Sequence, residues 1–320
     1  MKIGIIGTGK IVSEVIPVIQ EIDGITIVAI CSRSHSRQKA DWLAAEFSIG
    51  EVYDDYDLML RKSDIDFVYV ALANNAHFSY ALKALDHGKH VIIEKPICTS
   101  TSELDALIQK SLANHLYIFE AVTLLHMPHF KILKEELLRQ VGNIKLIVCN
   151  YSQRSSRYDL YLNNQITPAF DPACFGGALT DINIYNIQFV VALCGMPVEV
   201  AYHPNIGHNG IDTSGVAILH YPHFKAVCIG AKDSDGLSYG SIQGEDGWIE
   251  NEGPVSRLEK FKIYVGEQES EIDVQRHVHR LRFEFEHFRD IYHSGDDKMM
   301  RYYLDLSHQV MTVLDLLRAS

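Results

Sequence analysis

The first twelve residues of the chain place two glycines between an apolar strand pattern and a helical pattern. Lys2 to Ile6 form a short apolar run, Gly7-Thr8-Gly9 follows directly, and apolar residues recur at helical spacing from Ile11 onward. A strand that enters a helix through Gly-x-Gly is the context in which helix N-terminal amides bind a pyrophosphate. Val12 stands where the complete fingerprint has Gly or Ala. The pattern therefore predicts a dinucleotide-binding turn, with looser packing of the following helix against the strand because of Val12.

The alternation of strand and helix patterns continues to about residue 120. Helical spacing separates the apolar runs, and Gly88 falls where a left-handed helix cap is expected. Near-continuous apolar runs are typical of parallel strands that are buried on both faces. The runs are Lys2–Ile6, Ile25–Cys31, Asp66–Leu72, His90–Glu94 and Leu116–Glu120, with a shorter candidate at Glu51–Tyr53. We expect a Rossmann doubly wound parallel sheet.

After residue 122 strand patterns follow one another without helices between them. They are Ile144–Tyr151, Val216–Leu219, Lys225–Gly230, Ser238–Gln243 and Phe261–Val265, and helical patterns at Val278–His293 and Met299–Arg318 close the chain. We therefore predict an α/β protein with a dinucleotide-binding domain at 1–121. A substrate-binding and dimerisation α+β domain with an open, largely antiparallel sheet is predicted at 122–320. Its last helix is a candidate to pack back on the first domain.

The end of the second strand bears on the choice between NAD and NADP. An acidic residue there would bind the ribose 2′-hydroxyl of NAD, whereas small polar and arginine residues accommodate a 2′-phosphate. The segment reads Ser32-Arg33-Ser34-His35-Ser36-Arg37 and contains no acid, so NADP is favoured. NAD stays open, because Arg33 could stack on adenine and Ser36 could cap the next helix.

Three further segments complete a resemblance that runs over most of the chain. They are Ala71-Leu72-Ala73-Asn74-Asn75-Ala76-His77, Gly88-Lys89-His90-Val91-Ile92-Ile93-Glu94-Lys95-Pro96, and Phe175-Gly176-Gly177-Ala178-Leu179-Thr180-Asp181-Ile182-Asn183-Ile184-Tyr185. With the glycine turn, they resemble the glucose-fructose oxidoreductase and inositol dehydrogenase (Gfo/Idh/MocA) family, and are most similar to dihydrodiol-dehydrogenase-like members. In the first segment Leu72 and Ala73 replace that family's Thr and Pro.

The resemblance implies a set of site residues. Lys95, Asp181 and Tyr185 are the implied catalytic residues, with Tyr185 or Lys95 handling a proton and Asp181 orienting the substrate or tuning the other two. The cofactor is expected to contact Gly7, Thr8, Gly9, Lys10, Ile11, Ser32, Arg33, Arg37, Leu72, Asn74, His77, Glu94 and Lys95.

Simple physical arguments support two of these assignments. A strand that ends at Glu94 delivers Lys95 to the carboxyl edge of the sheet, where ligands of open α/β folds bind. Asp181 and Tyr185 are four residues apart, which stacks both side chains on one face of a helix. One alternative is that Lys95 is a surface lysine at a strand end. The other is that Asp181 lies on a polar helix face and Tyr185 packs in the core.

The aromatic-rich stretch Tyr151 to Phe170 lies between the second domain's first strand and the Asp181 segment. Arg154 and Tyr158 are its candidate substrate contacts, because aromatic faces suit a sugar or an aromatic ring. The same residues suit a subunit interface or the core. The family's open sheets pack together in dimers, so a homo-oligomer, a dimer or a dimer of dimers, is expected.

Composition excludes several classes of protein. The 41 acidic and 29 basic residues give a formal charge of −12, which disfavours nucleic acid as a partner. No apolar run approaches the ~20 residues that cross a bilayer, and the N-terminus lacks a signal-peptide pattern. Six scattered cysteines fit a reducing cytoplasm. His126, His129, His277 and His279 lack acidic partners at ligand spacing, so no metal site is expected.

The favoured function is hydride transfer between a nicotinamide cofactor and a hydroxyl or carbonyl carbon of a sugar, polyol or related small molecule. Two alternatives stay open. The same fold resembles non-catalytic dinucleotide-binding regulators that bind a partner protein, and some relatives cleave glycosides through tightly held NAD. Retention of Lys95, Asp181 and Tyr185 together argues against a regulator.

Overall fold

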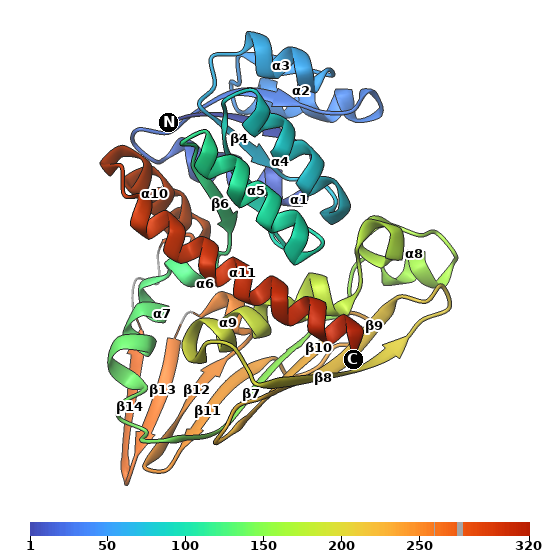
Figure 1. The fold of residues 1–320 in the computed structure, drawn as a ribbon. Helices are drawn as coiled ribbons and strands as arrows, with labels where there is room; N and C mark the ends of the chain where they lie inside the picture. Colours follow the sequence, from blue (N-terminus) through green and yellow to red (C-terminus); the bar gives the residue numbers. More distant parts are fainter. Residues whose placement is uncertain (259, 274–277) are drawn as a thin grey trace. The chain divides into compact units, whose positions relative to one another are not determined.

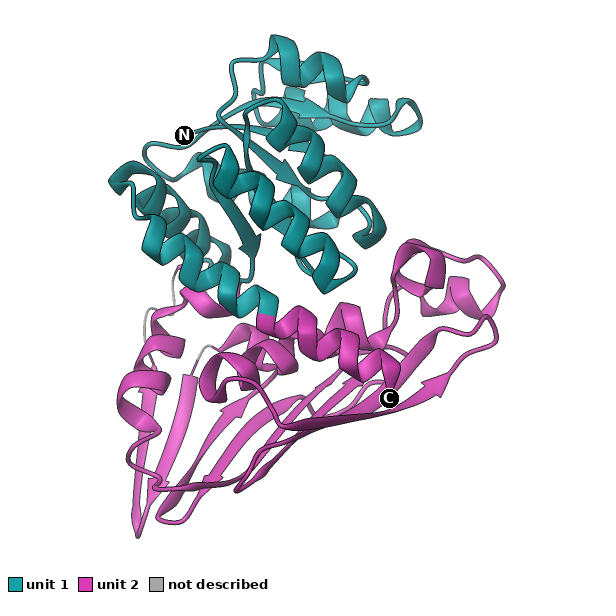
Figure 2. Ribbon diagram, viewed as in Figure 1, with its two compact units in different colours: residues 1–122, 279–308 teal, residues 123–278, 309–320 magenta. Residues whose placement is uncertain are grey.

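A computed structural model describes residues 1–258, 260–273 and 278–320. The chain divides into two compact units, shown in teal and magenta in Figure 2. Unit 1 contains residues 1–122 and 279–308, and unit 2 contains residues 123–278 and 309–320. Unit 1 is therefore built from two separate stretches of sequence.

Unit 1 is built on a six-stranded parallel sheet with the order β3-β2-β1-β4-β5-β6 (Figure 1). Its strands are β1 (Lys2–Ile6), β2 (Thr26–Cys31), β3 (Glu51–Tyr53), β4 (Phe67–Val70), β5 (His90–Glu94) and β6 (Ile118–Ala121). Between them run α1 (Lys10–Gln20), α2 (Arg37–Glu46), α3 (Tyr56–Lys62), α4 (His77–Asp86) and α5 (Thr101–Ala113). The predicted doubly wound parallel sheet is confirmed.

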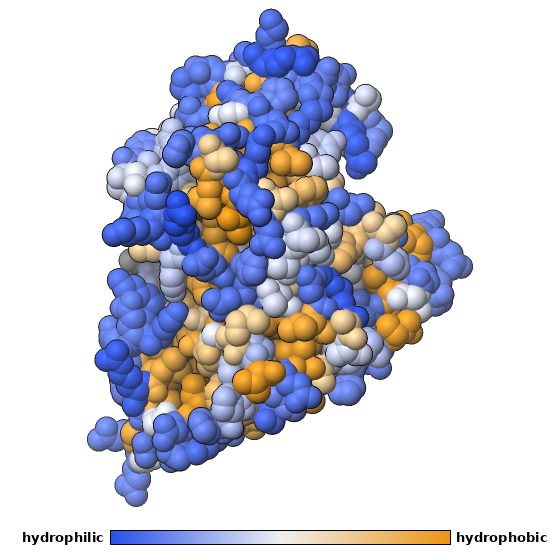
Figure 3. All heavy atoms as spheres, in the orientation of Figure 1, coloured by the Kyte–Doolittle hydropathy of each residue, from blue (hydrophilic) through white to orange (hydrophobic). Residues whose placement is uncertain are grey.

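Local sequence explains where several of these helices begin and end. The Asp55 side chain accepts from the Leu58 amide at the start of α3, and Ser100 accepts from the Glu103 amide at the start of α5. Gly88 follows α4 with φ at +69°, as the sequence predicts. Over α2 and α3 the surface in Figure 3 is mostly hydrophilic, which fits helices that bury one face and leave the other in water.

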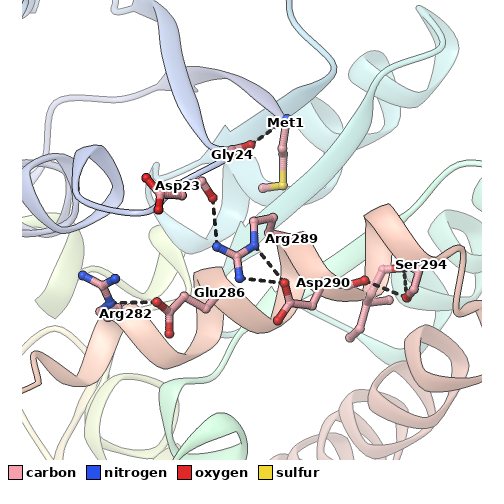
Figure 4. Close-up of polar contacts among 9 residues, drawn as sticks. Met1, Asp23, Gly24, Arg282, Glu286, Arg289, Asp290 and Ser294 are labelled. Carbon is pink, nitrogen blue, oxygen red and sulfur yellow. Dashed lines mark hydrogen bonds and ion pairs between the residues drawn. The ribbon is translucent and has the colours of Figure 1, made fainter.

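Helix α10 (Arg280–Ser294) lies near the end of the chain but belongs to unit 1. Figure 4 shows Arg289 donating from Nη1 to the carbonyl oxygen of Asp23 at 2.8 Å and from Nε to Asp290 at 2.8 Å. The Met1 ammonium donates to the neighbouring Gly24 carbonyl at 2.9 Å. The bond from Arg289 to Asp23 attaches α10 to the turn between α1 and β2.

Aromatic contacts fix α10 on the sheet of unit 1. The pairs are Phe67 with Tyr292, Tyr69 with Phe285 and Phe119 with Phe288, with ring centroids 5.0, 5.7 and 4.6 Å apart. Phe67 and Tyr69 lie two residues apart on β4, so their side chains point to the same face of the sheet. Helix α10 therefore covers that face.

Unit 2 is built on an eight-stranded sheet with the order β14-β13-β12-β11-β7-β10-β9-β8. Within the described strands of this unit 2 sheet, only β7 and β10 pair in parallel, which confirms an open, largely antiparallel sheet. The strands are β7 (Ile144–Ser152), β8 (Glu199–Ile206), β9 (Asp212–His220), β10 (Lys225–Ala231), β11 (Tyr239–Gly244), β12 (Gly247–Glu252), β13 (Lys260–Val265) and β14 (Gln268–Asp273). Strands β8, β12 and β14 were not predicted from the sequence.

One face of this sheet is covered by helical segments of unit 2. They are α6 (Thr123–His126), α7 (Pro128–Ile132), η3 (Leu133–Leu137), η6 (Leu179–Asn183) and α9 (Ile184–Cys194), while α8 (Tyr158–Leu162) lies in the connection after β7. Helix α11 (Asp297–Ala319) contributes residues to both units. Pro172–Cys194 has the length and hydropathy of a bilayer-crossing helix, but 78% of its most apolar window is buried, as in a core helix.

Candidate active site

The glycine turn packs tightly on one side and is open on the other. Gly7 adopts φ +122°, and a Cβ built on it would meet the Ala71 carbonyl oxygen at 2.2 Å. A Cβ on Gly9 would meet nothing within 4 Å. Gly9 caps the N-terminus of α1, where the cap has no side-chain hydrogen bond, and it is exposed. The turn therefore presents backbone at a helix N-terminus to open space, with Thr8, Lys10 and Ile11 on either side of it.

The ends of β4 and β5 share one edge of the unit 1 sheet with this turn. Because β1, β4 and β5 are parallel neighbours, the residues after each strand lie at the same carboxyl edge. Leu72 follows β4 and is half-buried, as is Asn74 at the start of the short helix η2 (Asn74–Ala76). Lys95 follows β5, is also half-buried, and is joined to Pro96 by a cis peptide bond.

His77 joins two of these loops from inside. Its side chain is fully buried, with Nδ1 2.8 Å from the Pro96 carbonyl oxygen and Nε2 3.2 Å from the Leu72 carbonyl oxygen. Burial lowers the pKa of His77, although both carbonyls oppose that shift. Any effect of His77 on a bound cofactor therefore passes through the loops that carry Leu72 and Lys95.

The segment after β2 offers one exposed arginine and one paired arginine. Ser32 is buried, and its amide donates to the Tyr53 carbonyl at 3.0 Å. Arg33 is exposed and precedes the short helix η1 (Ser34–Ser36). Arg37 donates from Nε to Asp41 at 2.8 Å. Of the two arginines, Arg33 is the one available to meet a 2′-phosphate.

Two carboxyl groups lie near Lys95 at the ends of β5 and β6. The Tyr69 hydroxyl donates to Glu94 at 2.5 Å, and burial raises the pKa of the Glu94 carboxyl. Glu120 accepts from the Ile97 amide at 3.0 Å, and burial raises its pKa to about 7. The charge of Lys95 opposes both of these pKa shifts. Titratable groups with shifted pKa values therefore lie at the edge of the sheet that carries Lys95.

Asp181 lies on a π-helical turn at the start of the long helical segment of unit 2. The turn η6 spans Leu179–Asn183, and α9 begins at Ile184. A π-helical turn holds more than four residues, so Asp181 and Tyr185, four residues apart, still lie near one face of the helical segment. Such turns are frequent at functional sites. Asp181 Oδ2 lies 2.7 Å from Nζ of Lys232, a residue that the sequence analysis missed.

Tyr185 is half-buried in the first turn of α9. Its ring lies 6.0 Å from that of Tyr151 at the end of β7, in a tilted arrangement. Two buried asparagines hold this part of the segment on the sheet: Asn183 donates to the Cys228 carbonyl and Asn186 to the Ile229 carbonyl, both at 2.9 Å. The position of Tyr185 is therefore set by bonds to β10.

Arg154 and Tyr158 lie in an aromatic cluster after β7. Arg154 forms a two-pronged ion pair with Asp159, at 2.8 and 3.3 Å, and its guanidinium lies 5.1 Å from the centroid of the Tyr158 ring. Tyr158 packs in turn on Tyr161 and Phe170, which are buried. Arg154 is thus already engaged by a carboxylate.

Asp212, a half-buried carboxylate, was not predicted from the sequence either. It accepts from the Leu179 amide and from the Tyr202 hydroxyl, both at 2.6 Å, and so caps the turn that carries Asp181. Burial raises the pKa of Asp212, against the opposing effects of these donors and of Lys232. Neither Asp212 nor Lys232 belongs to a recognisable motif, because their partners are distant in sequence.

The shape and charge around the glycine turn fit a dinucleotide. The Gly9 side of the turn is open, the helix N-terminus has no side chain on its amides, and Arg33 is exposed beside the neighbouring strand. Together with Lys95 at the same sheet edge, these features define the class of protein, an NAD(P)-dependent oxidoreductase. No group of three or more metal-ligating side chains is present among the described residues, a set that does not include His277.

Comparison with known proteins agrees with this class. Residues 1–119 match the model of the oxidoreductase family with an NAD-binding Rossmann fold, Gfo/Idh/MocA. The chain is 34% identical over 249 residues to scyllo-inositol 2-dehydrogenase (NADP+) IolU of Bacillus subtilis, covering 78% of this chain and 75% of that protein. It is 31% identical to the uncharacterized oxidoreductase YgjR of Escherichia coli, covering 90% and 87%.

A solved structure shows the same fold. A 3-ketoreductase from Actinomadura kijaniata in complex with NADP and TDP-benzene superimposes with a TM-score of 0.90 at 20% identity, covering 100% of this chain and 97% of that one. The chain belongs to the Gfo/Idh/MocA family of oxidoreductases, as its sequence motifs predict.

Proposed function

We propose that this protein transfers a hydride between a nicotinamide cofactor and the hydroxyl- or carbonyl-bearing carbon of a sugar, polyol or related small molecule. The observation that carries the proposal is the shared sheet edge: Lys95 follows β5 on the same carboxyl edge where the Gly7–Gly9 turn follows β1. The inositol dehydrogenase relative, whose name gives a polyol substrate, supports the substrate class.

The cofactor, when bound, supplies or accepts the hydride. The Gly7–Gly9 turn binds its pyrophosphate, and Leu72, Asn74 and Glu94 line the sheet edge beside it. Lys95 moves a proton to or from the reacting oxygen.

Asp181 and Tyr185 complete the assignment. Tyr185 donates a hydrogen bond or a proton to the reacting oxygen, and Asp181 orients the substrate. Arg154 and Tyr158 border the substrate through the aromatic cluster that contains Tyr161 and Phe170. Lys95 and Tyr185 are both candidates for the proton donor.

NADP is the proposed cofactor, with NAD as the weaker one. Exposed Arg33 and the lack of an acidic residue after β2 support this preference. The name of the inositol dehydrogenase relative and the NADP in the 3-ketoreductase complex also support it.

We further propose a homo-oligomer that buries the outer face of the unit 2 sheet. Val148, Val227 and Ile218 form one row across β7, β10 and β9, and all three are only half-buried. Their neighbours in sequence, which face the helices, are fully buried. An apolar sheet face left partly open is typical of a subunit interface. The six cysteines, all of which lie in the described part of the chain, form no disulfide, which supports a cytoplasmic location.

The test of the proposed function is a panel of sugars, polyols and aldehydes followed at the nicotinamide absorbance, with NADP and NAD in parallel. Turnover of a polyol or sugar with NADP is the expected result. Cofactor binding without any redox change across the panel would contradict the proposal and favour a regulator. Glycoside release without net reduction of the cofactor would favour glycoside cleavage.

A further inference from the structure

Lys232 is a cation held inside unit 2. Its side chain is only 3% exposed, which is rare for a lysine without partners. Its Nζ lies 2.7 Å from Asp181 Oδ2, donates to the Ala169 carbonyl oxygen at 2.5 Å, and lies 4.4 Å from the centroid of the Phe170 ring. A carboxylate, a carbonyl and an aromatic face are the neighbours that stabilise a desolvated ammonium.

The backbone around Lys232 fixes where this ammonium lies. The Lys232 amide donates to the Thr213 carbonyl at 2.9 Å, and its own carbonyl accepts from the Ser155 amide at 2.8 Å. Lys232 directly follows β10, whose residues pair with both β7 and β9. Its side chain therefore starts from a backbone that is bonded on both sides.

The ion pair is strongly asymmetric. The Lys232 side chain is 3% exposed, whereas that of Asp181 is 41% exposed. The cation thus lies behind the carboxylate, and the side of the pair that solvent reaches is the anion. A buried ammonium favours the ionised form of an adjacent carboxyl group, and an ionised carboxylate accepts hydrogen bonds but donates none.

The other acidic neighbour of Lys232 has donors of its own. Lys232 also acts electrostatically on Asp212, but Asp212 accepts from the Leu179 amide and the Tyr202 hydroxyl at 2.6 Å each. Asp233, the next residue in sequence, accepts from Thr213 and Ser214 at 2.7 and 2.8 Å. The direct ion pair of Lys232 is made with Asp181.

We propose that Lys232 is a positioning residue, which holds the Asp181 carboxylate in place as a hydrogen-bond acceptor, so that the site favours substrates that present a hydroxyl group to Asp181. A carbonyl or carboxylate at that position of the substrate would face a group with no hydrogen to donate. This rests on the proposed function, in which Asp181 contacts the substrate. It narrows the substrate class to molecules that carry a hydroxyl group for Asp181 to accept from, as a polyol does.

A double-mutant cycle tests whether Lys232 acts through Asp181. Lys232→Met, Asp181→Asn and the double variant are compared by kcat/KM for a polyol. Lys232→Met alone is expected to lower kcat/KM by about 10- to 100-fold. In the Asp181→Asn background the same change should lower kcat/KM by less than about threefold, because the carboxylate that Lys232 positions is absent. An equal loss in both backgrounds would reduce Lys232 to a structural residue and overturn the proposal.

The cycle has matched controls. Lys225→Gln alters an exposed lysine at the other end of β10 and should leave kcat/KM unchanged. Lys232→Gln keeps a donor for the Ala169 carbonyl, so it replaces Lys232→Met if that variant fails to fold. Lys232→Arg restores the positive charge and is expected to recover part of the activity.

A titration of Asp181 decides the proposal without any substrate. Aspartate carboxyl carbons are labelled with ¹³C, and the Asp181 signal is identified by its loss in Asp181→Asn. The pKa of Asp181 should rise in Lys232→Met by about one pH unit and return in Lys232→Arg. An unchanged pKa would overturn the proposal. If no member of the substrate panel reacts, the proposed function is wrong, but the titration still tests the ion pair between Lys232 and Asp181.

Discussion

Gly7 lies so close to Ala71 that a Cβ on the glycine would meet the Ala71 carbonyl oxygen at 2.2 Å. The contact joins the turn after β1 to the end of the neighbouring strand β4, where the Ala71 amide donates to the Ile6 carbonyl at 3.0 Å. Gly9, two residues on, has ordinary backbone angles and open space on its Cβ side. Gly7 therefore allows close packing against β4, whereas Gly9 leaves open space beside the turn.

Alanine at each glycine should separate folding from cofactor binding. Gly7→Ala forces a side chain into a positive φ and against a backbone oxygen, so it should lower the free energy of unfolding by about 1–3 kcal/mol. Gly9→Ala should change stability by less than about 0.5 kcal/mol but weaken NADP binding about tenfold or more, because its methyl occupies the approach of the pyrophosphate. Urea unfolding and fluorescence titration with NADPH measure the two effects. Normal NADPH affinity in Gly9→Ala would contradict this placement of the pyrophosphate.

Arg33→Ala should change the choice between cofactors. Loss of a charge-assisted contact to the 2′-phosphate is expected to weaken NADP binding by about 10- to 100-fold while leaving NAD within about threefold. Arg37→Ala is the matched comparison, since Arg37 is already paired with Asp41, and should cost less. Calorimetric titration with both cofactors measures the ratio. Equal losses for NADP and NAD would remove Arg33 from 2′-phosphate recognition.

Lys95→Ala and Tyr185→Phe together should identify the proton donor. The variant that lacks the donor is expected to lose about 10²- to 10⁴-fold in kcat, the usual contribution of general acid–base catalysis. The other variant should lose less, and both should bind NADPH within about threefold of the wild type. Undiminished turnover by Lys95→Ala would exclude Lys95 from the reaction, whatever Tyr185→Phe shows.

Glu120 should make the stability of the protein fall as pH rises. Burial raises its pKa from 4.5 to about 7, so the folded chain holds this proton more tightly than the unfolded chain does. The contribution of Glu120 is therefore most favourable below pH 4.5 and is lost as pH rises through 7. Glu120→Gln should raise stability at pH 8 by on the order of 2 kcal/mol and change it little at pH 5.

Thermal unfolding of both proteins across this pH range measures the Glu120 effect. Glu46→Gln, which alters an exposed side chain of α2, serves as the control and should leave the pH profile unchanged. A difference between wild type and Glu120→Gln that stays constant from pH 5 to pH 8 would mean that Glu120 titrates at the same pH in the folded and unfolded chains.

Much of the fold was predictable because of where its strands are buried. Strands such as β1 and β5 are covered on both faces and read as continuous apolar runs, so their limits were predicted within a residue or two. The edge strand β14 was missed because it has the sequence Gln-Glu-Ser-Glu-Ile-Asp and is mostly exposed. Its place in the sheet comes from backbone pairing with β13, which leaves no hydrophobic pattern to find.

The candidate site was predictable where a short motif carries it. The glycine turn and Glu94-Lys95-Pro96 are local, and their positions follow from the strands that precede them. The π-helical turn at Asp181 and the ion pair with Lys232 depend on how distant segments pack. A single lysine after an apolar strand looks like a surface residue in sequence, and only burial of its side chain distinguishes it.

The division of unit 1 into two stretches of sequence affects the protein while it is being synthesised. Residues 1–122 leave the ribosome long before residues 279–308, which supply Phe285, Phe288 and Tyr292 to the sheet. Until then the aromatic face around Phe67 and Phe119 has no cover, the kind of exposed surface that chaperones bind. The nucleotide-binding half of this enzyme is thus translated first but completed only when the chain is nearly finished.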